Sequence, residues 1–463
     1  MARVALVNPP VDGDLQTHRE GLGHLGLAYI AACLLRDGHR VIGLDCKTEP
    51  LSDQEIGRRL TEFGPSLVGV TAMTHEIHRA VRVCEIAHQA APGALTMAGG
   101  PHATALPERT LLEFPAIDIA VVGEGEETVC EIARRMESGS TALLGIQGIA
   151  FREDGKVVRN PNRPWIGNPD ELPLPAWRLF PKAISWGMFA GRGCPYGCKF
   201  CQRVLGRKVR MRSVDNVMAE IDALDSQLGA HDSWFQDETF ALNRRWTEEF
   251  LTKLEERNRR TGYVWRWKAN SRANLADESL YRRMKEAGCL AVGFGIESGN
   301  PEILKRIGKS ITKDMALRAI QSARRAGLET AAFFIIGHPG ETVWTALETV
   351  RFAGRLGADD IAVGVMVPYP GTEIWEMARA GQYNYRLLTE DWRMYDKYFG
   401  NALEIKGLSH KKLEALQVAT YLWFYLRQGR FRQLFSFLAR FHREAMAMLR
   451  RLLQPAHNVR TAH

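Results

Sequence analysis

Short apolar runs alternate with amphipathic segments of helical length along most of the chain, and this alternation limits the fold more than any other feature. Before residue 140, five apolar runs have the length of buried strands: Val4–Val7, Val41–Leu44, Leu67–Val70, Leu95–Ala98 and Ile117–Val122. Amphipathic segments lie between them: Leu25–Arg36, Gln54–Phe63, Ile77–Gln89 and Glu126–Met136. This order predicts an α/β domain over residues 1–140, with a doubly wound, Rossmann-like parallel sheet.

The same alternation returns over residues 186–370. Six more apolar runs are separated by segments of helical length: Gly187–Ala190, Ser233–Phe235, Val264–Lys268, Ala291–Ile296, Ala331–Ile336 and Ile361–Val367. Six strand–helix units predict a partial (β/α)6 barrel with its site at the carboxyl ends of the strands. Residues 141–185 are rich in Pro, Asn, Gly and Trp and are predicted to be a linker, with a small hairpin at Asp154-Gly155. Residues 371–463 are expected to be mostly helical.

Composition predicts a globular cytoplasmic protein. The chain has 463 residues, enough for two or three domains of about 150 residues each. No apolar run reaches the roughly 18 residues of a membrane span, and Met1-Ala2-Arg3 leads directly into a strand pattern instead of a signal peptide. Eight cysteines are too few for a disulfide framework in a chain of this length.

The positive charge is concentrated in the last part of the chain. Lys and Arg exceed Asp and Glu by 61 − 53 = 8, and residues 401–463 alone hold 11 basic and 3 acidic residues. Because the body is balanced, nucleic-acid binding is not expected. Apolar residues recur at helical spacing in the final segment: Phe431, Leu434, Phe435, Leu438, Phe441, Ala445, Met448 and Leu452. This helix could touch an anionic membrane surface or pack over the barrel's open side, and packing is the favoured interpretation.

Three cysteines stand together directly after an apolar strand pattern. Cys194, Cys198 and Cys201 are spaced by four and three residues, with the turn-formers Pro195 and Gly197 between them. Such a loop can bind three irons of a [4Fe–4S] cluster and leave the fourth iron free to chelate the amino and carboxylate groups of S-adenosylmethionine (SAM). A structural zinc site is the alternative, but it needs four ligands and no second Cys or His pair has zinc spacing.

This loop resembles the hallmark of the radical SAM superfamily, Cys-x3-Cys-x2-Cys with an aromatic residue before the third cysteine. The resemblance extends over about residues 1–400 and implies that SAM contacts lie at the ends of successive barrel strands. Acidic residues would accept hydrogen bonds from the SAM ammonium, an arginine would pair with its carboxylate, and later motifs would contact ribose and adenine. The residues at matching positions are Phe200, Asp237, Glu238, Arg272, Glu297, Ser298 and Gly337.

A doubly wound domain before such a barrel resembles the cobalamin-binding class, which includes methyltransferases and the anaerobic Mg-porphyrin cyclase type. Residues at matching positions are Asn8, Pro9, Leu25, Gly26, Thr71, Gly99, Gly100, His102, Gly123 and Glu124. The first strand is not followed by Asp-x-His-x-x-Gly, so the resemblance implies base-off cobalamin without a lower His ligand. Methylthiotransferases are a competing class, with a second cluster on three N-terminal cysteines. Cys33, Cys46 and Cys84 give that number, but Cys33 and Cys84 fall in helical patterns.

The resemblance implies methylation of an unactivated carbon in a small-molecule or lipid-like substrate, through a deoxyadenosyl radical and methylcobalamin. A non-methylating cyclisation, rearrangement or oxidation with the same cofactors is the alternative, and a sensor without turnover is a third possibility. A flavodoxin- or ferredoxin-type protein would supply electrons. The substrate is expected to be hydrophobic if Trp186, Trp234, Trp265 and Trp267 line its pocket, although core packing explains these residues equally well.

Overall fold

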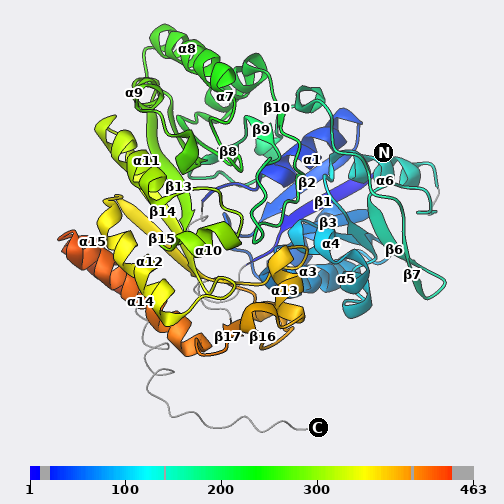
Figure 1. The fold of residues 1–463 in the computed structure, drawn as a ribbon. Coiled ribbons are helices and arrows are strands. Elements are labelled where there is room, and N and C mark those ends of the chain that lie inside the picture. The colour runs from blue at the N-terminus through cyan, green and yellow to red at the C-terminus, as the bar shows by residue number, and fades with distance from the viewer. Residues whose placement is uncertain (11–20, 140–141, 398–400, 441–463) are drawn as a thin grey trace.

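The computed structural model describes residues 1–10, 21–139, 142–397 and 401–440, which form two α/β units and a C-terminal region (Figure 1). The N-terminal unit is built on a seven-stranded sheet in the order β2-β1-β3-β4-β5-β6-β7. Its strands are β1 (Arg3–Asn8), β2 (Arg40–Asp45), β3 (Leu67–Thr71), β4 (Leu95–Gly99), β5 (Ile119–Val121), β6 (Ile149–Glu153) and β7 (Lys156–Arg159). Its α-helices are α1 (Leu25–Arg36), α2 (Asp53–Phe63), α3 (Ile77–Ala90), α4 (Pro101–Ala105), α5 (Pro107–Glu113) and α6 (Glu126–Glu137).

Helices cover both faces of this sheet, as the doubly wound prediction requires. Along β1, Val4 and Leu6 join the core that contains α1 and α6, whereas Ala5 and Val7 join the core that contains α2 and α3. Successive side chains of a strand point to opposite faces, so a strand that is apolar throughout must be covered on both sides. The continuous apolar runs of the sequence therefore became parallel strands, with β1, β3, β4 and β5 inside the sheet and β2 at its edge.

The segment 141–185 is not only a linker, because its hairpin belongs to the N-terminal sheet. Strand β6 pairs antiparallel with β5, and β7 pairs antiparallel with β6. The hairpin turns at Asp154-Gly155, as predicted, and both residues have positive φ. Without β6, strand β5 would present an unpaired edge, so the hairpin moves that edge to the short strand β7.

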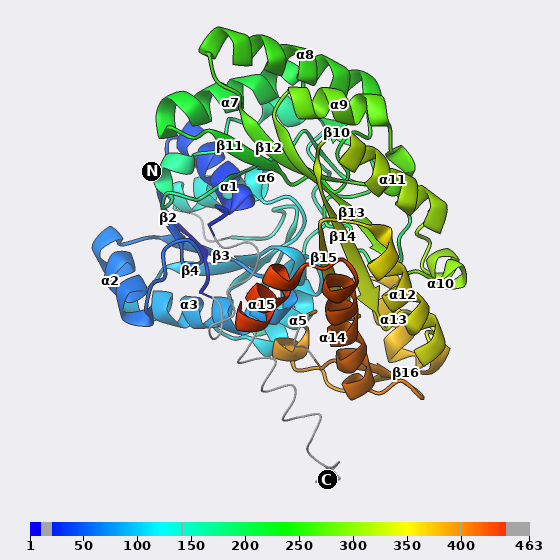
Figure 2. The same cartoon turned by 90° about the vertical axis from the view of Figure 1, so that its left-hand side faces the viewer.

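The second unit is a six-stranded, all-parallel sheet in the order β15-β14-β13-β12-β11-β8, as expected for a partial barrel. Its strands are β8 (Trp186–Met188), β11 (Asp232–Phe235), β12 (Arg266–Ser271), β13 (Cys289–Glu297), β14 (Glu329–Ile336) and β15 (Asp360–Val365). Its helices are α7 (Val214–Leu228), α8 (Arg244–Thr261), α9 (Glu278–Glu286), α10 (Pro301–Arg306), α11 (Lys313–Arg325) and α12 (Val343–Leu356). Figures 1 and 2 show these helices on the outside of the barrel.

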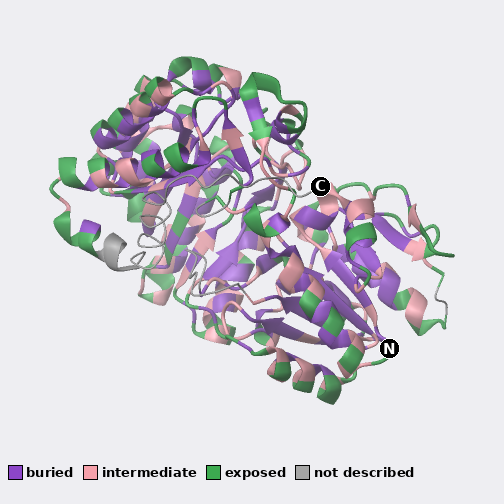
Figure 3. Cartoon of the chain, turned by 90° about the horizontal axis from the view of Figure 1, so that it is seen from below, coloured by how far each residue is buried: buried purple, intermediate pink, exposed green. Residues whose placement is uncertain are grey.

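Aromatic residues fill the space between the barrel sheet and its helices. Trp265 and Trp267 are fully buried, and Trp267 packs on Phe235 and Phe250. For these two tryptophans the core-packing interpretation is the one observed. Trp186 also packs in the core, against Trp177. The burial colours of Figure 3 show the same pattern, with buried residues in the sheets and exposed residues on the outer helices.

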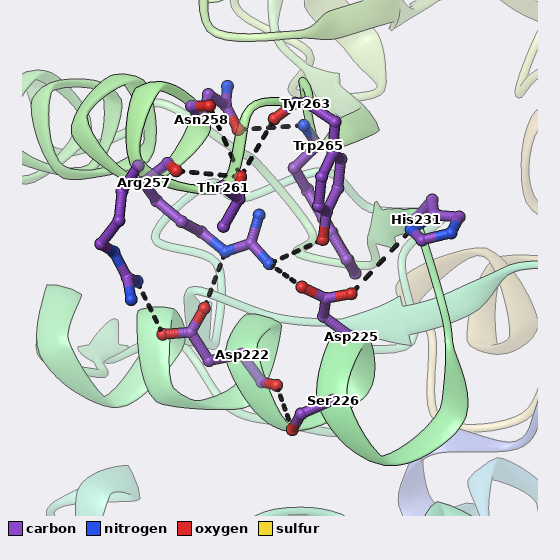
Figure 4. A network of polar contacts seen from close by, with 10 residues as sticks. Asp222, Asp225, Ser226, His231, Arg257, Asn258, Thr261, Tyr263 and Trp265 are labelled. Atoms are coloured by element: carbon purple, nitrogen blue, oxygen red, sulfur yellow. Dashed lines mark hydrogen bonds and ion pairs between the residues drawn. The ribbon is translucent and has the colours of Figure 1, made fainter.

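A polar network joins α7 to α8 on the outer face of the barrel (Figure 4). Arg257 of α8 is buried and donates to Asp222 at 2.8 Å and to Asp225 at 2.6 Å, both on α7. It also donates to the Tyr263 hydroxyl at 3.0 Å. We call Arg257, Asp222, Asp225 and Tyr263 the outer network. It fixes two neighbouring helices to each other.

The C-terminal region covers the edge strand β15. It contains α13 (Glu373–Arg379), α14 (His410–Arg427), α15 (Phe431–Arg440) and a small sheet of β16 (Tyr385–Leu387) and β17 (Leu403–Ile405). Gln417 donates to the Val363 carbonyl at 2.7 Å, and the Val363 N–H donates to the Tyr421 hydroxyl at 2.8 Å. Side chains of α14 therefore satisfy backbone groups that the edge of the sheet would leave unpaired.

The final helix is buried on one part of its surface and exposed on another, and contact with a membrane stays a prediction. In α15, Leu434 is buried, whereas Phe431 and Phe435 are 55% and 69% exposed. Phe441, Ala445, Met448 and Leu452 lie outside the described residues. Within the described part of the chain, no helix is both long and apolar enough to cross a membrane.

Candidate functional site

A cavity of about 270 Å³ lies at the carboxyl ends of strands β1, β3, β4 and β5. Its far wall belongs to the barrel, through Phe189, Arg192, Leu205 and Gln236. Ligands of doubly wound sheets bind at this end of the strands. Seven of the residues predicted to bind cobalamin line it: Leu25, Gly26, Thr71, Gly99, Gly100, Gly123 and Glu124.

The other three predicted residues do not line this cavity. His102 is fully buried and packs edge-on against Trp392 with ring centroids 5.2 Å apart, and burial lowers its pKa to about 3. The side chain of His102 therefore packs against the C-terminal region, and a contact from it to cobalamin stays a prediction. Asn8 is also buried and donates to Asp45 at 2.7 Å. Pro9 is buried beside it.

His24 lines the cavity and was missed in the sequence. It is the N-cap of α1, and its Nδ1 accepts a hydrogen bond from the Leu27 N–H at 3.2 Å. Ser, Thr, Asp and Asn are the usual N-cap residues, so a histidine gave no capping signal. Only the helix start at Leu25, which the sequence does show, could have pointed to the residue before it.

The three cysteines lie on one loop that begins at strand β9 (Gly191–Arg192), which pairs with β10 (Arg210–Met211). The hydrogen bond with Cys201 lowers the pKa of Cys198 to about 6, and the positive charges of Lys309 and Arg272 act in the same direction against the effect of burial. Arg272 donates to the Cys198 sulfur at 3.5 Å. A thiol that ionises readily in cationic surroundings is suited to bind iron.

Asp237 and Glu238 hold the start of this loop. The Asp237 carboxylate accepts from the N–H groups of Ala190 and Gly191, both at 2.9 Å, and Glu238 accepts from Gly193 N–H at 3.2 Å. Burial raises the pKa of Asp237 to about 7. These two residues therefore position the strand that leads into the cysteines, and a contact from them to the SAM ammonium stays a prediction.

Arg272 and Glu297 lie beside the same loop on neighbouring strand ends. Arg272 lies 3.7 Å from the centre of the Tyr196 ring and donates to the Lys309 carbonyl. The Lys309 ammonium pairs with Glu297 at 2.8 Å, and both side chains are buried. Glu297 has φ +72°, a conformation that non-glycine residues rarely adopt and that functional sites often hold.

Ser298 and Gly337 directly follow β13 and β14, and each is held by a different contact. The Ser298 hydroxyl lies 3.1 Å from that of Thr349 on α12, so it is already engaged in a helix contact. Gly337 donates its N–H to Glu341 at 2.5 Å and has φ +102°. Between these two turns, the ring of Phe200 lies 6.1 Å from that of His338. Of the predicted SAM residues, Phe200 is part of the cysteine loop, and Asp237, Glu238 and Arg272 contact the loop or its start. Contact of Glu297, Ser298 and Gly337 with SAM stays a prediction. Lys309 and His338, which were not predicted, lie near Phe200 of this loop.

Four buried charged residues join the cavity to the cysteine loop. Arg192, two residues before Cys194, donates to Glu124 at 2.8 Å and to Glu126 at 2.6 Å. Arg210 also donates to Glu124, at 2.7 Å. We call Arg192, Arg210, Glu124 and Glu126 the junction network. Its carboxylates come from the N-terminal unit and its arginines from the barrel, so it links the two units directly.

The family comparisons agree with this geometry. The radical SAM superfamily matches residues 188–353, and the B12 binding domain matches residues 17–133. A protein of Pyrococcus horikoshii named as an uncharacterized methyltransferase is 36% identical, with 92% of this chain and 93% of that protein covered. This chain belongs to the cobalamin-binding radical SAM enzymes.

A further relative and two solved structures are also similar to this chain. The anaerobic magnesium-protoporphyrin IX monomethyl ester cyclase of Rubrivivax gelatinosus is 32% identical over 76% of this chain and 65% of its own length. The radical SAM methyltransferase TsrM of Kitasatospora setae, solved with cobalamin and a [4Fe–4S] cluster, has a TM-score of 0.74 and 21% identity, with 91% of both chains covered. The cobalamin-dependent SAM radical enzyme OxsB has a TM-score of 0.73 at 17% identity, over 90% of this chain and 66% of OxsB. These structures share the fold.

The cavity of this cobalamin-binding radical SAM enzyme fits part of cobalamin. Glycines keep its rim free of side chains: at Gly100, with φ +91°, a Cβ would lie 2.9 Å from the Thr71 hydroxyl and 3.0 Å from the Ala72 carbonyl. Leu6, Ile30 and Met97 make its inner part apolar. A volume of about 270 Å³ suits a portion of the cofactor, such as its nucleotide tail, and not the whole molecule.

The cysteine loop fits an iron–sulfur cluster better than a single metal ion. Among the residues that the structure describes, no three His, Cys, Asp or Glu side chains converge as the ligands of one metal ion do. Three thiolates that each bind a different iron of a cubane do not need to converge. Cys194, Cys198 and Cys201 would hold the cluster, and Arg272 and Lys309 supply positive charge beside it.

The cysteines of the methylthiotransferase alternative do not share a site. Cys33 lies in the core that contains α1, whereas Cys46 and Cys84 lie in the core on the opposite face of the sheet. Burial raises the pKa of all three thiols to about 12. Ligands of one cluster must meet and ionise, and these side chains do neither.

Proposed function

We propose that this enzyme methylates an unactivated carbon of a small-molecule or lipid-like substrate. The observation that carries the proposal is the wall shared by the two cofactor sites: Phe189, Arg192 and Gln236 belong to the barrel but line the cavity of the cobalamin-binding domain. Arg192 lies two residues from Cys194 in the same strand and loop. A methyl carrier and a radical source that share a wall can act on one substrate between them. The match to a named methyltransferase over nearly the whole of both chains supports the same conclusion.

When bound, the cluster and SAM supply one-electron chemistry and a carbon radical, and cobalamin supplies a methyl carrier. The chain's own residues position and shield that chemistry. Asp237 and Glu238 hold the cysteine loop through backbone N–H groups, and the Lys309–Glu297 pair fixes the end of β13. The junction network keeps the cavity wall and the loop at a constant separation. The enzyme's part in catalysis is therefore orientation and the exclusion of water.

A non-methylating reaction of the cyclase type is the second candidate. It is favoured by the 32% identity to the magnesium-protoporphyrin ester cyclase. This chain covers only 65% of that cyclase, compared with 93% of the methyltransferase from Pyrococcus horikoshii. Methyl transfer is therefore the preferred reaction.

Anaerobic reconstitution with iron, sulfide and hydroxocobalamin tests the proposal in two stages. Metal analysis and the visible spectrum should show one cluster and one cobalamin per chain, and Cys198→Ala should lose the cluster bands. The loaded enzyme is then given SAM with a deuterated methyl group, a reductant and a small-molecule extract. A product that carries the label is expected. A converted compound without label would establish the cyclase type, and absence of both S-adenosylhomocysteine and deoxyadenosine would leave only a sensor.

We also propose two partners. A flavodoxin- or ferredoxin-type protein would reduce the cluster, which should be measurable as deoxyadenosine formation with that protein in place of dithionite. Peripheral contact with anionic lipid through α15 is supported by the exposure of Phe431 and Phe435 next to the basic tail. Liposomes that retain the full chain no better than a truncation after residue 428 would exclude this contact.

A further inference from the structure

The face of the barrel sheet that lies away from the helices carries an unpaired lysine. Along β12, Trp267 and Ala269 are buried toward the helices, whereas Lys268 is exposed and Asn270 is partly exposed. Strand β12 lies between β11 and β13, so it is an inner strand of the sheet. An exposed lysine on an inner strand means that the concave face of the sheet is open at this level.

Neighbouring side chains confirm which face this is. A Cβ added to Gly293 would meet the Asn270 side chain and would lie 2.8 Å from the Phe333 ring, so both side chains lie over Gly293. Gln236 lies over Gly187 in the same way, and it lines the cavity of the cobalamin-binding domain. Lys268 and Asn270 therefore share a face with the residue that borders the cobalamin cavity.

The Lys268 side chain has no protein partner in the part of the chain that the structure describes, since no hydrogen bond or ion pair involves its ammonium group. The cations near the carboxyl ends of the barrel strands have protein partners: Lys309 pairs with Glu297, and Arg272 contacts Cys198. Ammonium groups inside protein folds are normally paired or hydrated. The Lys268 ammonium is exposed on the open concave face without a protein partner among the described residues, so it is available to an anionic ligand.

An aromatic side chain stands next to this lysine. Trp234 is the register partner of Lys268 on β11, about 4.8 Å away across the ladder, and it is partly exposed on the concave face. It differs in this from Trp265 and Trp267, which are fully buried. The concave face thus offers a cation, a flat aromatic surface and the amides of Asn270 and Gln236.

We infer that Lys268 and Trp234 form a substrate subsite that binds a planar, apolar molecule through an attached carboxylate or phosphate group. This inference rests on the proposed function, because it names the substrate class of the same site. The Lys268 ammonium would donate to the anionic oxygens, and the Trp234 ring would stack on the apolar portion. SAM would bind nearer the carboxyl ends of the strands than this subsite, beside Glu297 and the cysteine loop.

Calorimetric titration of the holoenzyme with three related probes tests this subsite. The probes are 1-naphthylacetate, 1-naphthyl phosphate and the neutral 1-naphthylacetamide, and saturating S-adenosylhomocysteine occupies the SAM site. We expect at least one anion to bind more tightly than the amide. Lys268→Met should lower the affinity for that anion on the order of 10-fold and leave the affinity for the amide unchanged. Lys268→Arg should restore the affinity for the anion.

The matched control is Arg266→Met, which removes an exposed cation two residues away on the same strand and face. It should leave the affinity of all three probes unchanged. If naphthyl phosphate binds more tightly than naphthylacetate, the substrate carries a phosphate group. If naphthylacetate binds more tightly, the substrate carries a carboxylate group. Equal binding of the amide and the anions, no effect of Lys268→Met, or anion binding that is seen only when S-adenosylhomocysteine is left out would overturn the inference.

Probe binding does not need turnover, so the two proposals can fail separately. Enzyme that transfers the deuterated methyl group but does not bind the anionic probes through Lys268 would refute only the subsite. Enzyme that binds the probes as expected but transfers no label to any product would refute only methyl transfer.

Discussion

The junction network and the outer network are both built on a buried arginine, but they differ in the exposure and origin of their carboxylates. In the junction network, Glu124 and Glu126 are buried together with Arg192. In the outer network, Asp222 and Asp225 keep 49% and 25% of their side-chain surface exposed. Water can therefore compensate part of a loss in the outer network, whereas the carboxylates of the junction network are shielded from water.

Buried charge fixes the arrangement of distant segments in the junction network but not in the outer network. The outer network joins two helices that are consecutive in the chain, and apolar packing between α7 and α8 holds them in any case. The junction network joins Glu124 to residues 68 and 86 positions away, across two units with separate sheets. Buried ion pairs of this kind are demanding in geometry and gain little net stability, so their main effect is to specify one arrangement.

The largest expected effect comes from Arg192→Met. It leaves Glu126 buried without its cation and Glu124 with Arg210 alone, and breaking a buried pair in this way costs about 3–5 kcal/mol. Cobalamin affinity should fall as well, because Arg192 and both glutamates line the cavity. Urea unfolding and a spectrophotometric cobalamin titration measure the two effects. Wild-type affinity for cobalamin in this variant would show that the network does not shape the cavity.

Within the junction network, Glu124→Gln should cost more than Glu126→Gln. Glu124 accepts from Arg192, Arg210 and the Ile166 N–H, whereas Glu126 accepts from Arg192. We expect a difference of about 1.5–3 kcal/mol in unfolding free energy, since each hydrogen bond to a charged group contributes about that much. If the two variants lose the same unfolding free energy in urea titrations, the additional hydrogen bonds of Glu124 do not add to stability.

The matched substitution in the outer network, Arg257→Met, should cost less, about 1–3 kcal/mol. Its aspartates remain partly hydrated after the change, and the aliphatic side chain can still pack beside Trp265. Cobalamin affinity and the cluster spectrum should be unchanged, because no member of this network lines the cavity. A cobalamin defect as large as that of Arg192→Met would remove the distinction between the two networks.

Glu341 is a buried carboxyl group that has no cation beside it in the described part of the chain, unlike the carboxylates of both networks. Glu341 has no ion-pair partner among the described residues, and burial raises its pKa from 4.5 to about 7. The folded protein therefore holds a proton that the unfolded chain releases, so this group's contribution to stability falls as pH rises from about 5 to 7 and is constant above.

Glu341→Gln should remove that dependence. The variant's urea midpoint should change less between pH 5 and pH 8 than the wild-type midpoint does. Glu341 accepts from the N–H groups of Gly337 and His338, and the glutamine oxygen can still accept from them. An identical pH profile for variant and wild type would show that Glu341 is ionised in the folded protein.

Several features were readable from the sequence because short-range rules produce them. Apolar runs of strand length between amphipathic helices predicted both parallel sheets, and the three cysteines with their turn-formers predicted the cluster loop directly after a strand. The hairpin at Asp154-Gly155 followed from turn chemistry. In each case the residues that decide the outcome lie within a few positions of one another.

Tertiary structure decided what those residues meet. Nothing near His102 in the sequence indicates that Trp392 will cover it, and nothing near Glu124 indicates that it will accept from Arg192. Of the tryptophans in the barrel strands, Trp234 faces the open side while Trp265 and Trp267 face the helices. Periodicity fixes that alternate side chains point to opposite faces of a strand, but only the packing of distant segments determines which face becomes core and which becomes the site.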